Sequence, residues 1–162
     1  MYGTRHAFDV YQKTKALNEK SIISEYMMVI DGEPDIQYLL KQFPVPIASP
    51  EDVIEVPLVG GMKTQTSQVT RYDFRGSIAF QETVAGHVRA LFEKMAAERT
   101  VSHRPTFNAV IYHGTPDNHT QKWRIIDAML FGFDPIDADA ENRGQLVLYT
   151  GQIAYMYFPG IE

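Results

Sequence analysis

The segment QLVLYTGQIAYMYF, residues 145–158, is apolar on both faces of any strand that it forms. Successive side chains of a strand point to opposite faces of the sheet. The apolar side chains divide between the two faces, with Leu146, Leu148, Ala154, Met156 and Phe158 on one and Val147, Tyr149, Ile153, Tyr155 and Tyr157 on the other. Such a strand must be covered on both sides, either by two layers of its own domain or by one layer and another subunit.

Other segments also have the pattern of strands. Residues 71–81 alternate most clearly, because one face carries Tyr72, Phe74, Ile78 and Phe80 and the other carries polar or charged side chains. The remaining strands are predicted over residues 24–31, 35–47, 107–113 and 123–133. We expect the first two of these to be joined by a turn, since Gly32 and Pro34 favour turn geometry.

One amphipathic helix is predicted from about Thr83, which is expected to be its N-cap, to Arg99. Its apolar stripe consists of Val84, Val88, Leu91, Phe92 and Met95. Strands precede and follow this helix without β–α–β alternation. The order therefore predicts an α+β fold, a mainly antiparallel β-sandwich or barrel with one amphipathic helix and one long extended hairpin.

Two segments do not fit a compact core. Residues 51–70 contain β-branched side chains, but Pro57 and the pair Gly60-Gly61 interrupt them, which favours a long hairpin with a flexible tip. This segment has little charge and is poorly suited to burial in its own core, so we expect a partner chain to cover it. Residues 1–21 are polar with scattered aromatic side chains, and we expect an arm with a single helical turn.

The residue types give no support to catalysis or cofactor binding. The chain has no cysteine, which excludes disulfides, thiol nucleophiles and Cys-ligated metals. Its histidines have none of the spacings of metal-binding motifs, so structural or surface roles are favoured for His6, His87, His103, His113 and His119. We predict no catalytic, cofactor-binding or metal-binding residues. The longest apolar run, 26–30, is far too short to span a bilayer, and we expect no membrane partner.

Acidic side chains gather at Asp134, Asp137, Asp139 and Glu141, in a pattern that invites a calcium-loop interpretation. Counted from Asp137, the sixth residue is Asn142 rather than glycine, and the twelfth is Leu148 rather than glutamate. A solvated loop between two strands is therefore favoured. The whole chain has a formal net charge of −5, which disfavours binding to the phosphate backbone of a nucleic acid.

The order of segments resembles the tail tube proteins of contractile-tailed bacteriophages, and through them the tubes of type VI secretion systems and pyocins. The resemblance covers about residues 22–158 and depends on four patterns, namely YMMVID…IQYLLKQFPVPI, VIEVPLVGGMKTQ, RYDFRGSIAFQETVAGHVRALFEKM and IIDAMLFGFDPIDADAENRGQLVLYTGQIAYMYF. It implies a single tail-tube-like domain over residues 1–162, in which 1–21 form an N-terminal arm and 51–70 form a hairpin for ring stacking.

The resemblance also implies a structural, non-enzymatic subunit without cofactors. Copies of the chain would form hexameric rings, and the rings would stack into a hollow tube through which DNA passes without specific binding. A negative lumen suits that role because like charge suppresses phosphate binding. The implied partners are the tail sheath, tape measure and baseplate proteins. The implied location is the tail of a virion that is assembled in the host cytoplasm.

Two sets of residues follow from this resemblance. The acids expected to face the lumen are Glu51, Asp52, Glu55 and Asp73. The residues expected to contact the next ring are Leu58, Val59, Gly60, Gly61, Met62, Lys63 and Thr64. We expect the acidic turn at residues 137–141 to lie on an outer or ring-stacking surface instead.

Three alternatives remain open at this stage. The chain could be a baseplate protein that initiates the tube, or a tube component of a type VI secretion system or pyocin. More remotely, it could be a small β-barrel that binds a ligand through the acidic loop and a histidine. This last hypothesis requires a stable monomer with a closed apolar cavity, and it gives no role to the hairpin expected over residues 51–70.

Overall fold

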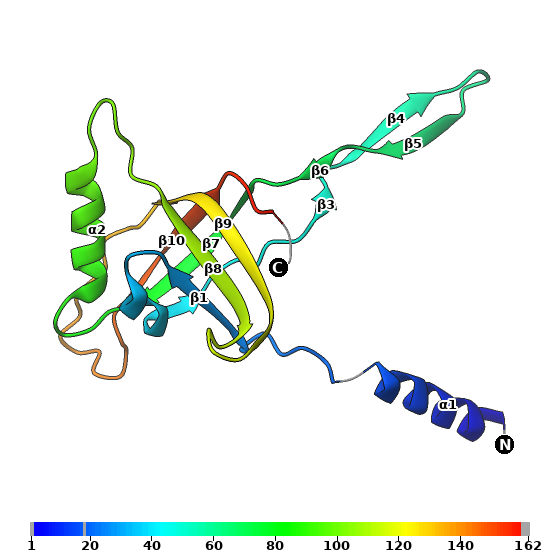
Figure 1. The fold of residues 1–162 in the computed structure, drawn as a ribbon, viewed down its shortest axis with the longest axis horizontal. Helices are drawn as coiled ribbons and strands as arrows, with labels where there is room; N and C mark the ends of the chain where they lie inside the picture. The colour runs from blue at the N-terminus through cyan, green and yellow to red at the C-terminus, as the bar shows by residue number, and fades with distance from the viewer. Residues whose placement is uncertain (1, 18, 160–162) are drawn as a thin grey trace.

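The computed structural model describes residues 2–17 and 19–159, and within them six antiparallel strands form the central sheet (Figure 1). The strand order across the sheet is β1-β8-β9-β10-β7-β2. The strands are β1 (Tyr26–Ile30), β2 (Leu40–Gln42), β7 (Phe74–Gln81), β8 (Phe107–Gly114), β9 (His119–Phe131) and β10 (Leu148–Tyr155). The predicted α+β fold with mainly antiparallel strands is confirmed.

A bulge in β9 bends the sheet into a half-barrel. One residue of β8, Asn108, stands opposite two of β9 here, because Phe107 pairs with Ala128 whereas Ala109 pairs with Ile125. The extra residue, Asp127, has a positive φ of 55°, and its N–H donates to Asn108 Oδ1 at 3.1 Å. Bulges bend a strand and increase its twist. The last residues of β9 consequently turn away from β8 and pair with β10.

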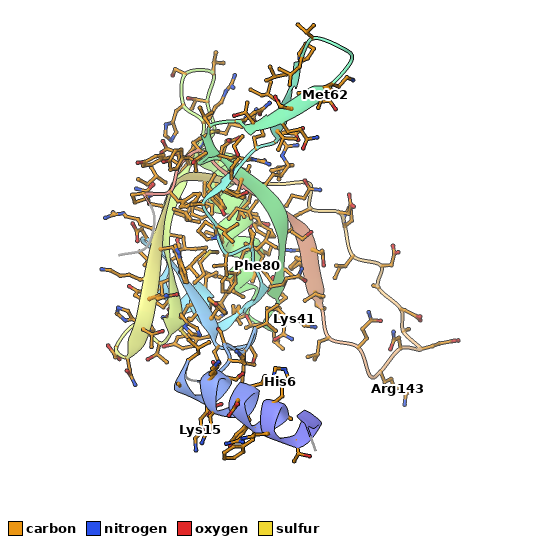
Figure 2. The ribbon with its side chains drawn as sticks, turned by 90° about the vertical axis from the view of Figure 1, so that its right-hand side faces the viewer. His6, Lys15, Lys41, Met62, Phe80 and Arg143 are labelled. Carbon is orange, nitrogen blue, oxygen red and sulfur yellow. The ribbon has the colours of Figure 1, made fainter. Side chains whose placement is uncertain are left out.

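Helix α2 (His87–Glu98) closes one side of the half-barrel (Figure 1). Its buried Val88 and Leu91 belong to the same core cluster as side chains of five strands. Phe92 meets the buried ring of Phe80 edge-on, with the ring centroids 5.7 Å apart. Figure 2 shows Phe80 in the middle of the half-barrel. The predicted stripe is thus confirmed except at its first position, since Val84 is fully exposed.

The start of α2 differs from the prediction, which gave Thr83 as the N-cap. The helix begins at His87, after Gly86, whose φ is +77°. N–H groups of the first helical turn are satisfied by Glu82, the residue just after β7, whose carboxylate accepts hydrogen bonds from the N–H groups of Val88 and Arg89 at 3.1 and 3.0 Å and also from that of Thr83 at 2.9 Å. Partial burial would raise the pKa of Glu82, but these N–H donors outweigh it and lower that pKa.

The predicted pairing of residues 24–31 with 35–47 is wrong. The first segment forms β1, but Pro34–Tyr38 is a short 3-10 helix and only Leu40–Gln42 is a strand. Proline is well suited to the first turn of a helix because its φ is fixed and its missing N–H is not needed there. Strands β1 and β2 consequently lie at opposite edges of the sheet and do not form a hairpin.

Strand β10 shows how a strand with two apolar faces is accommodated. Tyr149, Gly151, Ile153 and Tyr155 are buried, whereas the alternate positions are half-buried or exposed. Gly151 leaves room for the ring of Phe133, which lies 2.7 Å from where a Cβ would be. One face of the strand therefore covers the core, and the other is available at the surface of the single subunit.

Candidate assembly surfaces

A two-stranded arm projects from the body of the molecule (Figure 1). It consists of β4 (Val53–Pro57) and β5 (Lys63–Ser67), and every residue from 51 to 67 is exposed. Two short strands, β3 (Ser49–Pro50) and β6 (Thr70–Arg71), pair at its base. The predicted hairpin over residues 51–70 is confirmed.

The turn of the arm explains its glycine pair. Gly60 and Gly61 have φ values of +85° and +79°, a left-handed backbone that side chains disfavour. The Leu58 N–H donates to the Met62 carbonyl oxygen at 2.7 Å and closes the turn. Figure 2 shows Met62 at the far end of the arm. The residues predicted to contact the next ring, 58–64, therefore make up the tip of the arm, where Val59 is 100% and Met62 67% exposed.

The two faces of the arm differ in polarity. Ile54 pairs with Thr66 and Val56 with Thr64, so one face carries only β-branched side chains. We call this the β-branched face. The other face contains an ion pair between Lys63 Nζ and Glu55 Oε2 at 3.3 Å. A two-stranded hairpin is at best marginally stable in water, so this arm is suited to being covered by another chain.

The acids predicted to face a lumen lie along this arm and at its base. Glu51, Asp52 and Glu55 are on or beside β4, and all three are exposed. Asp73 follows β6 and lies 3.9 Å from Arg71 Nε through its Oδ1 atom. Two of the four charges are thus partly balanced within the subunit. That these four acids face a lumen remains a prediction.

A second surface is the long loop between β9 and β10, residues 132–147. It contains the acidic residues noted in the sequence, and the Asp139 carboxylate accepts a hydrogen bond from the Glu141 N–H at 3.0 Å. Such a local turn fits the predicted solvated loop. Nine residues between Ile136 and Leu148 line an open groove of about 630 Å³. Figure 2 shows the part of the loop around Arg143 standing well away from the sheet.

Solved structures of contractile injection machines share this architecture. The chain is similar to one in the extended sheath–tube complex of an extracellular contractile injection system, PVC, with a TM-score of 0.62 at 10% identity, covering 93% of this chain and 96% of that one. It is similar to the tube-terminating cap of the anti-feeding prophage, AFP, with a TM-score of 0.61 at 10% identity, covering 90% and 92%. The chain has a tail-tube-like fold.

A chain of the AFP baseplate has the same tail-tube-like fold, with a TM-score of 0.56 at 13% identity over 89% of this chain and 97% of that one. No family model and no curated protein matches the sequence. The resemblance to tail tube proteins inferred from the order of segments is therefore confirmed in the fold.

Two histidines of the tail-tube-like fold have local partners. His113 stacks on Tyr26 and lies 3.0 Å from Ser21 Oγ and 3.7 Å from Glu25 Oε2, which holds the segment before β1 against the sheet. His87 Nδ1 lies 2.6 Å from the Thr83 hydroxyl. Among residues 2–17 and 19–159, no three His, Asp or Glu side chains are grouped to hold a metal ion. In the same residues, no helix is long and apolar enough to cross a membrane.

Helix α1 (Tyr2–Ala16) is the feature that the sequence interpretation missed. It is fifteen residues long, not the single turn that was expected. Its side chains from Gly3 onward are exposed, and Figure 1 shows it projecting from the body. The signal was present in the helical spacing of Ala7, Phe8 and Tyr11, but the polar composition around them obscured it.

Proposed function

We propose that the protein is a structural, non-enzymatic subunit of a contractile tail, whose copies assemble into rings that stack as a hollow tube. The arm carries this proposal, because residues 51–67 are all exposed and include apolar side chains on β4 and at the tip. Exposed apolar surface of this kind marks an interaction site. The shared fold with sheath–tube, cap and baseplate components supports a structural role in a tail-like assembly.

In the proposed tube the tip of the arm contacts the next ring, and the β-branched face packs on a neighbouring subunit. Glu51, Asp52, Glu55 and Asp73 face the lumen. The resemblance to bacteriophage tail tube proteins supports six subunits in a ring and DNA as the cargo. It also supports the tail sheath, tape measure and baseplate proteins as partners, and assembly in the host cytoplasm into the tail of a virion.

Deletion of residues 58–66 tests the role of the arm. No residue of the deleted segment belongs to the core cluster, so the subunit should keep its circular dichroism spectrum and its cooperative unfolding. It should lose the ability to form rings or tubes, as seen by sedimentation velocity. A deletion variant that still polymerises like the full chain would overturn the proposal.

Reversal of lumen charges tests the conduit. Tubes of the E51K/E55K variant should retain DNA at low salt and release it as the salt concentration rises. The variant E93K/E98K makes the same charge change on α2 and is the matched control, because α2 covers the side of the half-barrel away from the arm (Figure 1). Equal DNA retention by the two variants would contradict a lumen position for Glu51 and Glu55.

A second candidate function is a component at the end of the tube. It is favoured by the similarity to chains of the tube-terminating cap and of the baseplate, with TM-scores of 0.61 and 0.56. A terminator would form single rings that bind the end of a preformed tube and do not stack. Electron microscopy of the purified protein distinguishes the two functions, since only a tube subunit gives stacks of variable length.

A further inference from the structure

Helix α1 has an apolar face that its own chain leaves uncovered. Ala7, Phe8 and Tyr11 follow the spacing of one helix face, and Phe8 and Tyr11 are 57% and 60% exposed. Asp9 lies on the opposite side of the helix. A lone helix of about fifteen residues is only marginally stable in water, and most helices in proteins are stabilised by packing an apolar face. This helix therefore needs a surface to pack against.

The charge of α1 is opposite to that of the rest of the chain. The helix carries Arg5, Lys13 and Lys15 against a single acid, Asp9, so its net charge is +2, whereas the whole chain has −5. Lys15 is four residues after Tyr11 and therefore lies on the apolar face beside it. A fitting surface should combine apolar and acidic side chains.

The groove in the loop between β9 and β10 has that combination. Its lining includes exposed Ile136, Leu146 and Val147 together with Asp137 and Asp139. Residues 134–143 contain four acids and one arginine, a net charge of −3. The groove is open to solvent and has a volume of about 630 Å³.

The helix of the same subunit is badly placed to reach this groove. Figure 1 shows α1 on one side of the body and the loop on the other, beside α2. The segment that follows the helix is fixed to β8, because Ser21 and Glu25 contact His113. Only residues 17–20 separate α1 from Ser21, and they span at most about 18 Å when fully extended. This placement favours an occupant from another molecule.

We propose that α1 docks in the groove of residues 136–148 on a second copy of this chain. Phe8 and Tyr11 cover Leu146 and Val147, and Lys15 lies next to Asp137 and Asp139. Because the two complementary surfaces lie on opposite sides of the subunit, the contact is head-to-tail, which generates a closed ring or a helical stack. The inference rests on the proposed self-assembly, but it uses surfaces that the arm does not contribute.

The absence of native cysteine makes crosslinking a clean test of this contact. A Y11C variant and an L146C variant are mixed, assembled and treated with a bismaleimide crosslinker. We expect a covalent dimer on a denaturing gel, whereas D9C mixed with L146C gives little, since Asp9 lies on the other side of the helix. Tubes that form without a Y11C–L146C dimer would overturn the docking proposal and leave the proposed function intact.

Two further outcomes are informative. In the double variant Y11C/L146C, crosslinking within one chain at high dilution would show that the helix occupies its own groove, which overturns the head-to-tail contact. A dimer that appears without any rings or tubes would support the docking and count against the proposed function. Charge exchange completes the test: K15E should lower the dimer yield several-fold, and K15E mixed with a D137K groove partner should restore it.

Discussion

Replacing Ile54 and Val56 by threonine removes apolar surface from the β-branched face of the arm without changing its shape. Threonine is also β-branched and favours strands, so the hairpin itself should persist. The matched control is V53T, because Val53 is on the same strand but on the face that carries the ion pair of Glu55 with Lys63. The two variants therefore separate loss of a contact from loss of the hairpin.

The expected size of the effect follows from exposure. Ile54 and Val56 are 46% and 39% exposed in the single subunit, and this is the part that a neighbour covers. Full burial of such a side chain contributes about 1.5–3 kcal/mol, and threonine keeps one methyl group. The double substitution should cost about 1–2 kcal/mol of association free energy, which lowers the association constant roughly 5–30-fold.

The critical concentration for polymerisation measures this change directly. Pelleting or sedimentation velocity at a series of protein concentrations should show it raised by the same factor for I54T/V56T and nearly unchanged for V53T. Circular dichroism should show an intact fold for both variants. An unchanged critical concentration for I54T/V56T, or an equal increase for V53T, would refute the assignment of this face as a contact surface.

Two further predictions concern stability. The E82Q variant keeps an acceptor at the start of α2 but loses the carboxylate charge, so at pH 7 its free energy of unfolding should fall by about 0.5–1 kcal/mol. The pKa of Glu82 is lowered in the fold. The extra stability of the wild type should therefore persist at every pH above about 4.3, the ordinary pKa of a glutamate, and vanish as the pH falls further. Urea unfolding at a series of pH values measures this, and a stability difference between wild type and E82Q that does not change with pH would contradict it. Tyr155 is buried against Phe74, and within the described residues its hydroxyl has no hydrogen-bond partner, so Y155F should be as stable as the wild type or more stable by up to about 2 kcal/mol. Burial raises the pKa of Tyr155, so the wild type alone should lose stability through this group as the pH rises above about 10, and equal alkaline sensitivity of Y155F would count against the assignment.

Local patterns in the sequence predicted the elements whose structure is decided locally. The strand predicted over residues 71–81 is present from Phe74 to Gln81, and its alternation holds from Phe74 to Ile78, although Tyr72 is exposed and Ala79 is buried on the face expected to be polar. The apolar stripe from Val88 to Met95, which depends on burial of one helix face, is also present. Gly60-Gly61 marked the turn of the arm because that turn requires a left-handed backbone.

Other features depended on distant parts of the chain. Nothing local shows that β1 pairs with β8, some eighty residues away in sequence, or that Glu82, just after β7, satisfies N–H groups of the first turn of α2. The groove is lined only by residues between Ile136 and Leu148, which come together when the loop folds. The composition around α1 is polar because its apolar face is narrow, which is why the helix was underestimated.

Negative-stain electron microscopy of the purified protein across a concentration series tests self-assembly most directly, with sedimentation velocity on the same samples. We predict rings or hollow tubes of uniform width above a critical concentration, with tube length increasing as the concentration rises. A compact monomer at every concentration, with the arm and α1 both intact, would contradict the proposal that these two exposed elements serve assembly.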